Sequence, residues 1–228
     1  SSEINEILDI GIAGVKAKVI WKEGSKHIGI FGEQAGEWQW ISEKIKNFKS
    51  QNPNKKIKVL NLFGYTGIAS LVAAASGAEV THVDASKQSI EWARENQKAS
   101  HMENLPIRWI VDDAVKFLKR EINRGEKYDA IIMDPPSYGK GPKGEVWKAE
   151  TKLVDFLKLC SQVISDEPLF IILNMYSTDL SSLSLSNMLL DMMQGKKDSI
   201  TSGELAIKQE AGNKILPMSI FSIWENVG

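Results

Sequence analysis

The segment from Lys58 to Ala69 constrains the fold more than any other part of the chain. It reads Lys-Val-Leu-Asn-Leu-Phe-Gly-Tyr-Thr-Gly-Ile-Ala, an apolar run that stops at a glycine-bearing turn and continues into small, helix-favouring residues. A second apolar run ends at Asp84, twenty residues after Gly64. A strand, a glycine turn, a helix and an acidic residue after the next strand are typical of a nucleotide-type cofactor site at the carboxyl edge of a parallel sheet.

The turn itself differs from the pattern of dinucleotide-binding proteins. It has two glycines, Gly64 and Gly67, instead of the three of G-x-G-x-x-G. Glycine allows the backbone to approach a ligand closely, and the Asp84 carboxylate can accept hydrogen bonds from both hydroxyls of a ribose. Because the pyrophosphate cradle is poorly matched, we expect a ribose-bearing cofactor without phosphates.

Composition limits the class of protein. With 228 residues, 43% hydrophobic and 25% charged, the chain can bury one core. A net charge of -1 gives no basic field from which nucleic-acid binding could be inferred. A single cysteine excludes an internal disulfide, and no apolar run has the length of a membrane span or the form of a signal peptide, so we expect a cytoplasmic protein. The start at Ser1, without methionine, fits a processed or excised piece that an N-terminal module preceded.

Alternating apolar runs and helical patterns predict a parallel sheet with helices on both faces. Residues 204–210 and 215–224 flank a Gly212-Asn213 turn that leaves no room for a crossover helix, so they predict a terminal hairpin with an antiparallel strand. We expect strands near 57–63, 79–84, 107–111, 128–134 and 168–174, helices near 67–76, 87–99, 114–123 and 149–164, and a loop over 177–186 that leads into a helix ending near Met193.

The N-terminal part predicts a β-hairpin and a helix. Residues 15–31 read as two strands around a turn at 22–26. Residues 35–48 carry an apolar stripe at helical spacing, which includes Trp38 and Ile41. We divide the chain into a hairpin extension over 1–34 and one domain over 35–228.

Four groups of candidate residues follow four successive strands, where doubly wound sheets bind their ligands. In the last group, two prolines after an aspartate hold the chain extended and rigid as it leaves a central strand. The groups are Phe63, Gly64, Tyr65, Thr66 and Gly67; Asp84, Ala85 and Ser86; Asp112, Asp113 and Ala114; and Asp134, Pro135, Pro136 and Tyr138.

The third group contains two neighbouring carboxylates with different expected roles. One of Asp112 and Asp113 can accept a hydrogen bond from the exocyclic amine of adenine, while the other caps the following helix. The sequence leaves the assignment open, with a preference for Asp113 because it directly precedes Ala114.

In their order and spacing, the four groups resemble the class I S-adenosylmethionine-dependent methyltransferases. A closer similarity, to the bacterial 23S ribosomal-RNA large-subunit methyltransferase group, is carried by the segments Asn61–Gly67, Val83–Ser86, Asp112–Asp113 and Asp134–Tyr138, together with His27–Gln34. The resemblance covers roughly residues 15–225. It implies an α/β fold: a Rossmann-like, doubly wound sheet of seven strands with an antiparallel C-terminal hairpin, preceded by an N-terminal β-hairpin and helix. It also implies an enzyme that uses S-adenosyl-L-methionine.

The resemblance assigns a role to each group. The turn from Gly64 to Gly67 would pass under the methionine and ribose parts of the cofactor, and Asp84 would hold the ribose hydroxyls. Asp112 or Asp113 would contact adenine. Asp134, with the carbonyls of Pro135 and Pro136, would lie near the methionine amine and the methyl-accepting atom, and Tyr138 would stack on a substrate base.

The position after the fifth strand bears on the methylated atom. Family members that methylate carbon-5 of cytosine carry a nucleophilic cysteine there. Here residues 173–178 contain none, and Cys160 sits in an apolar helical pattern typical of a core residue. We therefore favour methylation of a nucleobase nitrogen in RNA, and we expect that this RNA is ribosomal RNA.

Other side chains give weaker indications. Lys140, Lys143 and Lys148 around Trp147 suit either RNA contact or a solvated loop. His82 is expected to be packed and neutral, His101 exposed, and His27 either structural or part of the pocket. Three scattered histidines and one cysteine make no metal site.

Rival functions stay open at this stage, as does the oligomeric state. A methyltransferase of the same fold could act on a protein or a small molecule. From other classes, a nicotinamide-dependent oxidoreductase is disfavoured by the glycine pattern and the terminal hairpin, and a catalytically silent cofactor-binding module is a further alternative.

Overall fold

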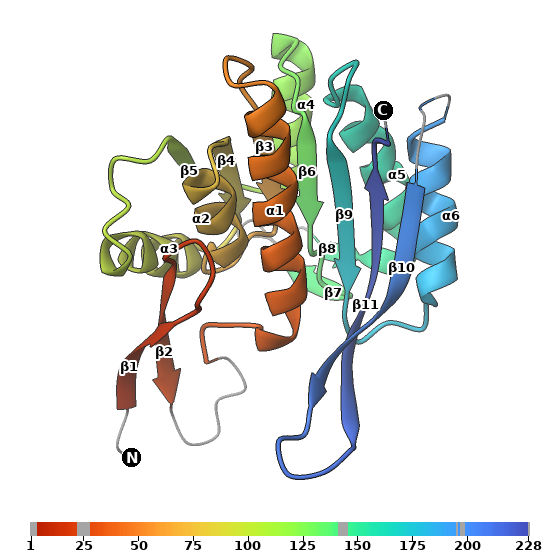
Figure 1. Ribbon diagram of the computed structural model, residues 1–228. Helices are drawn as coiled ribbons and strands as arrows, with labels where there is room; N and C mark the ends of the chain where they lie inside the picture. Colours follow the sequence, from red (N-terminus) through yellow and green to blue (C-terminus); the bar gives the residue numbers. More distant parts are fainter. Residues whose placement is uncertain (1–3, 22–27, 141–145, 195, 197–198, 228) are drawn as a thin grey trace.

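The computed structural model describes residues 4–21, 28–140, 146–194, 196 and 199–227. A seven-stranded sheet runs through the centre (Figure 1). Its strands are β3 (Lys58–Leu62), β4 (Glu79–Asp84), β5 (Ile107–Val111), β6 (Ala130–Met133), β9 (Phe170–Met175), β10 (Ser199–Lys208) and β11 (Ile215–Glu225). The order across the sheet is β10-β11-β9-β6-β3-β4-β5.

The strand directions agree with the prediction. The five strands from β5 to β9 in this order are parallel, whereas β11 lies antiparallel to both β9 and β10. Every residue of β6 and β9 is buried, because central parallel strands are covered on both faces. The five expected parallel strands and the terminal hairpin are thereby confirmed.

Helices cover the two faces of the sheet with separate apolar clusters. On one face, α1 (Ala35–Gln51) and α2 (Ile68–Ala75) bury Trp38, Ile41 and Leu71, and α3 (Lys87–Ala99) lies beside them (Figure 1). On the other face, α4 (Ala114–Arg124), α5 (Ala149–Gln162) and α6 (Ser182–Met192) bury Phe117 and Phe156. No helix in the described part of the chain is long and apolar enough to cross a membrane.

The N-terminal hairpin exists, and the strand expected before residue 22 is present as β2 (Lys16–Trp21), but the prediction of its partner strand was wrong. β1 (Ile4–Asp9) pairs antiparallel with β2, whereas residues 28–31 form no strand. The reversal occurs early because Gly11 and Gly14, both at positive φ, turn the chain between them, and Asp9 accepts a hydrogen bond from the Gly11 amide. The expected turn at 22–26 lies outside the described residues, and the division at residue 34 stays a prediction.

Three short elements were not predicted, and one helix begins earlier than expected. The three short elements are η1 (Gly32–Gln34) and the antiparallel strands β7 (Tyr138–Lys140) and β8 (Val146–Lys148). Helix α6 already begins at Ser182, inside the expected loop, because the Ser181 hydroxyl caps the Ser184 amide.

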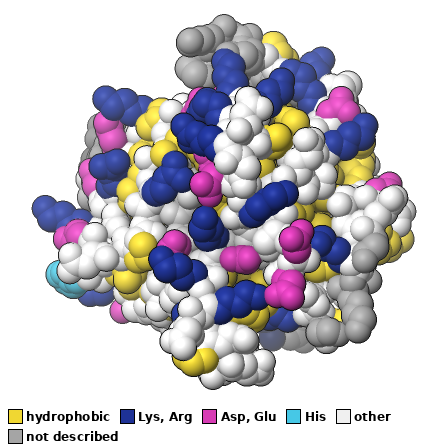
Figure 2. Space-filling model, turned by 90° about the horizontal axis from the view of Figure 1, so that it is seen from above, with side chains coloured by type: hydrophobic (Ala, Val, Ile, Leu, Met, Phe, Trp, Pro, Cys, Tyr) yellow, Lys and Arg dark blue, Asp and Glu magenta, His cyan; other side chains and the backbone are white. Residues whose placement is uncertain are grey.

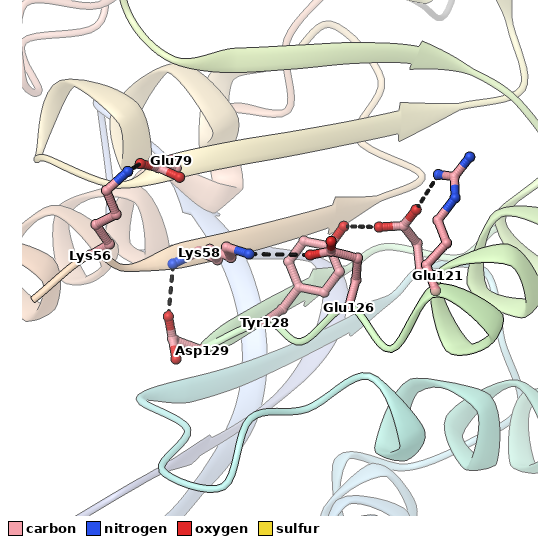
Figure 3. A network of polar contacts seen from close by, with 8 residues as sticks. Lys56, Lys58, Glu79, Glu121, Glu126, Tyr128 and Asp129 are labelled. Atoms are coloured by element: carbon pink, nitrogen blue, oxygen red, sulfur yellow. Dashed lines mark hydrogen bonds and ion pairs between the residues drawn. The ribbon is translucent and has the colours of Figure 1, made fainter.

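The two ends of the sheet differ in character. The β9–β11 ladder ends at the pair Met175–Ile220, so the tip of the β10–β11 hairpin extends beyond the carboxyl edge (Figure 1). Figure 2 looks onto the opposite, amino edge, where basic and acidic side chains are interspersed. The charges there pair with each other, as Lys56 with Glu79 and Lys58 with Glu126 do in Figure 3.

Candidate active site

All four predicted groups contribute to a single cleft at the carboxyl edge of the sheet. The turn after β3 and the segments that begin at the carboxyl ends of β4, β5 and β6 contribute to its lining. Aromatic side chains from the residue before η1, from β8 and from the residue after β9 also line it. The lining residues are Phe31, Phe63, Tyr65, Asp84, Ala85, Ser86, Ser89, Asp113, Val115, Asp134, Pro136, Gly139, Trp147 and Tyr176.

The turn after β3 has a strained backbone and is held by hydrogen bonds to neighbouring segments. Phe63, Tyr65 and Gly67 all have positive φ, a conformation that costs energy for residues other than glycine. The Gly64 amide donates to the Val83 carbonyl, and the Thr66 hydroxyl donates to the Gly29 carbonyl at 2.8 Å. The turn is therefore held in place by neighbouring segments before any ligand is considered.

The glycines of this turn are required by the protein's own packing. A Cβ atom on Gly64 would lie 2.3 Å from the His82 ring, and one on Gly67 would lie 2.9 Å from the Ala93 Cβ atom. We expected these glycines to let the backbone approach a ligand. The close contacts give a different physical reason for both of them.

Asp84 is fixed by two backbone amides. Its Oδ2 atom accepts a hydrogen bond from the Tyr65 amide at 2.9 Å, and its Oδ1 atom accepts one from the Ser86 amide at 2.8 Å. Burial raises the pKa of Asp84, and the two amides counteract this. Since Ser86 itself caps α3, Asp84 is not the N-cap residue, and each of its oxygens keeps a second lone pair for a ligand.

Asp113, and not Asp112, both caps the following helix and lines the cleft. It caps α4 by accepting a hydrogen bond from the Lys116 amide. Asp112 forms an ion pair with Arg120 and does not line the cleft. Which of the two contacts adenine stays a prediction.

The Asp134–Tyr138 segment forms the wall below β6. Asp134 accepts a hydrogen bond from the Gln34 amide group at 2.8 Å, and burial raises the pKa of Asp134 to about 6. The Pro136 carbonyl accepts a hydrogen bond from the Trp147 indole at 2.5 Å. Tyr138 is 52% exposed and does not line the cleft, so the aromatic surface at this wall belongs to Trp147.

A smaller polar pocket adjoins the cleft beneath α1, and sequence reasoning missed it. Glu37 of α1 is only 6% exposed and accepts a hydrogen bond from the Asn174 amide group of β9 at 2.6 Å. Burial raises the pKa of Glu37 to about 8. A signal was present, because Glu37 lies one helical turn before Ile41 on the apolar stripe and Asn174 interrupts an apolar strand.

The remaining predicted side chains fall where their sequence patterns indicated, as far as they are described. His82 and Cys160 are fully buried, and burial lowers the pKa of His82 to about 3 and raises that of Cys160. His101 and Lys148 are exposed. His27 and Lys143 lie outside the described residues, as does the Lys140 side chain. Within the described chain, no cluster of three or more His, Cys, Asp or Glu side chains could hold a metal ion.

The strand order, the single antiparallel strand β11 and a carboxyl-edge cleft with aspartates after β4, β5 and β6 define a class I S-adenosylmethionine-dependent methyltransferase fold. The family model described as "Conserved hypothetical protein 95" matches residues 40–155, just over half of the chain. The chain belongs to this family, within the S-adenosylmethionine-dependent methyltransferases.

Known relatives support this placement. The solved SAM-dependent methyltransferase from Agrobacterium tumefaciens is 42% identical with a TM-score of 0.88, and the match covers 97% of this chain and 70% of that one. The structure of SMU.776 complexed with SAH has a TM-score of 0.73 at 22% identity, covers 96% of this chain and 56% of that one, and shows the shared fold.

Curated relatives match over shorter stretches. Ribosomal RNA large subunit methyltransferase I of Klebsiella pneumoniae is 37% identical over 82 residues, which is 36% of this chain and 20% of the relative. The chain spans about a fifth to a third of the length of the curated relatives that it matches.

Proposed function

We propose that the chain transfers the methyl group of S-adenosylmethionine to a nucleobase nitrogen of RNA, with ribosomal RNA in the cytoplasm as the expected substrate. The observation that carries the proposal is the convergence of Asp84, Asp113 and Asp134, each from the end of a different strand, in one cleft. The names of the curated relatives, which are ribosomal RNA large subunit methyltransferases, support the choice of substrate.

The residues of the cleft fit this cofactor. The free lone pairs of Asp84 suit the two ribose hydroxyls, and the other carboxylate oxygen of Asp113 suits the adenine amine. Ala85 and Ser86 line the cleft beside Asp84, and Val115, which follows Ala114, lines it beside Asp113. Of the two neighbouring aspartates, we therefore assign adenine to Asp113.

Bound S-adenosylmethionine supplies an activated methyl group on a sulfonium, so the protein mainly has to align donor and acceptor and to exclude water. Asp134 and the Pro135 carbonyl are the acceptors that we assign to an amine of the target base. The Pro136 carbonyl already accepts the Trp147 indole, so we assign it to holding the wall. The Trp147 ring, which packs on Phe63 at a centroid distance of 5.3 Å, offers a surface on which a base can stack.

The lack of a cysteine at the end of β9 supports nitrogen over carbon-5 as the methylated atom. Carbon-5 chemistry needs a nucleophilic thiol. The only cysteine of the chain, Cys160, is fully buried in α5, and its thiol pKa is raised by burial. A nitrogen acceptor needs no covalent nucleophile.

The test uses ribosomal RNA from cells that lack the gene, incubated with the protein and S-adenosylmethionine carrying a labelled methyl group. We expect label in the large-subunit RNA, and mass spectrometry of its nucleosides should place it on a base nitrogen. Label on carbon-5 would contradict the assigned atom. Label in protein or in small molecules, with none in RNA, would contradict the assigned substrate.

A further inference from the structure

Two buried oxygen atoms beside the cleft have no hydrogen-bond partner. They are Glu37 Oε1 and Asn174 Oδ1, on side chains that are 6% and 2% exposed. The other polar atoms of these two side chains face each other, since Asn174 Nδ2 donates to Glu37 Oε2 at 2.6 Å. Buried acceptors are rarely left unpaired in folded proteins, so a hydrogen-bond donor is expected from outside the chain.

The pocket around these oxygens favours a cationic donor. Its described lining includes Glu37 and Asp134 and contains no lysine, arginine or histidine. Glu33 adds further negative charge nearby and, together with Asp134, raises the pKa of Glu37 beyond the effect of burial. A buried carboxylate is costly unless a cation pairs with it, and the chain supplies none within this lining.

The pocket lies where the far end of an extended ligand would reach. It shares Phe31, Phe63, Tyr65 and Asp134 with the cleft. Asp84 ends β4 and Asp113 follows β5, whereas Asn174 belongs to β9, on the other side of β3, and holds Glu37 there by a hydrogen bond. If S-adenosylmethionine binds with its adenine at Asp113 and its ribose at Asp84, its methionine part therefore extends across the turn after β3 toward this pocket.

We propose that Glu37 and Asn174 hold the ammonium group of the methionine part of S-adenosylmethionine, an assignment that rests on the proposed function. An ammonium group has three N–H donors, and the two orphan oxygens supply two acceptors for them. The pair acts by binding and positioning the cofactor, and it needs no contact with the methyl-accepting base.

Binding of the ammonium group changes the protonation of Glu37. In the free protein Glu37 is protonated at neutral pH, since its pKa is about 8. The arriving ammonium group favours the ionised carboxylate, so binding at pH 7 releases a proton. Asp134, with a pKa of about 6, and Tyr176, whose pKa is raised, face the same region, and Glu33 faces it from η1. Asp134 adds to proton release only at lower pH, since its pKa is about 6.

Calorimetry with two ligands and two variants tests the proposal. S-adenosylmethionine carries the ammonium group, and 5′-methylthioadenosine has the same adenosine part without it. Glu37→Gln keeps the shape and the Asn174 contact but removes the charge, and we expect it to weaken S-adenosylmethionine binding about tenfold or more. The same variant should leave the 5′-methylthioadenosine affinity within about twofold. Glu33→Gln, which removes an equal charge outside the pocket lining, is the matched control and should change both affinities little.

Titrations at pH 7 in two buffers of different ionisation enthalpy measure the released proton. We expect nearly one proton per S-adenosylmethionine for the native protein and for Glu33→Gln, and close to none for Glu37→Gln. Equal weakening of both ligands by Glu37→Gln, or unchanged proton release, would overturn the assignment while cofactor binding stands. If the native protein bound neither ligand, the proposed function would fall and this inference with it.

Discussion

Asp84, to which we assign the ribose hydroxyls, is already held in place in the free protein. Two backbone amides hold its carboxylate, so little side-chain freedom is lost on binding. We expect Asp84→Ala to weaken S-adenosylmethionine binding about a hundredfold, since two hydrogen bonds to a charged group disappear and the turn amides lose their acceptor. Isothermal calorimetry measures the change. An affinity equal to that of the native protein would contradict the assigned role of Asp84.

Gly64 is a residue whose necessity comes from packing. A methyl group at this position would collide with the His82 ring, which is fully buried and bonded to Ser70. We expect Gly64→Ala to lower the free energy of unfolding by about 1–3 kcal/mol in urea denaturation. Because the collision is pairwise, the double variant with His82→Ala should lose less than the sum of the two single changes. Strict additivity would show that the strain has another source.

The residues of the cleft divide into those that the sequence revealed and those that it concealed. Asp84, Asp113 and Asp134 follow apolar strands, so the strand pattern alone brings them to one edge. Glu37 lies on the apolar stripe of α1, but the several other charged residues of this helix gave no reason to single it out. Its burial depends on how α1 packs over β9, and no local pattern encodes that contact.

At the scale of elements, the parallel strands and their crossover helices could be predicted because each is a long apolar or amphipathic run between clear turns. The N-terminal hairpin could not, because strand pairing depends on the partner. Residues 28–31 are as apolar as β1, yet β1 pairs with β2 since the glycine turn after Asp9 lies nearer. The β7–β8 pair is too short to leave a periodic signal.

One buried side chain connects the N-terminal hairpin to the turn after β3. Asn96 of α3 accepts a hydrogen bond from the Lys18 amide at 2.7 Å and donates one to the Thr66 carbonyl at 2.9 Å. We expect Asn96→Ala to lower the free energy of unfolding by about 2–3 kcal/mol, since it leaves two backbone groups unpaired. Asn96→Asp, which keeps only the acceptor, serves as the matched comparison. Chemical denaturation gives both values, and a loss below that of a surface substitution would contradict the bridging role.

The β7–β8 pair supports the wall that we assign to the substrate. Trp147 of β8 donates to the Pro136 carbonyl and packs on Phe63 and Phe156. Trp147→Phe keeps an aromatic ring and removes only the indole donor. We expect kcat/KM for RNA to fall about tenfold while S-adenosylmethionine affinity stays within about twofold. Filter-based methylation assays and calorimetry separate the two effects, and an equal loss in both would place Trp147 in the cofactor part of the cleft.

On the scale of the whole molecule, the two edges of the sheet serve different purposes. At the amino edge, fully buried Glu121 accepts a hydrogen bond from the Tyr128 hydroxyl at 2.7 Å and pairs with Arg124, so its charge is compensated (Figure 3). At the carboxyl edge, Glu37 and Asp134 are buried without a cation in the described pocket lining. Buried Glu121 is thus paired within the protein, whereas buried Glu37 and Asp134 fit the ammonium group and the base amine that we propose for them.

This imbalance predicts how the stability of the free protein depends on pH. The pKa of Glu37 rises from 4.5 to about 8 on folding, so the folded state holds an extra proton between these values and stability falls as pH rises. Asp134 acts in the same direction between 3.8 and about 6. His82, whose pKa falls from 6.5 to about 3, acts in the opposite direction below pH 6.5.

Above pH 6.5 Glu37 dominates the change, because Asp134 is mostly ionised in the folded state and His82 is at least half neutral in the unfolded state. We therefore expect the free energy of unfolding to fall by about 1–2 kcal/mol between pH 6.5 and 8, because each pH unit contributes at most about 1.4 kcal/mol per proton. Urea denaturation at half-unit steps measures the slope. Glu37→Gln should flatten it, Glu33→Gln should retain it, and saturating S-adenosylmethionine should remove it by holding Glu37 ionised in the folded state. A slope that survives Glu37→Gln would show that another group governs this pH range.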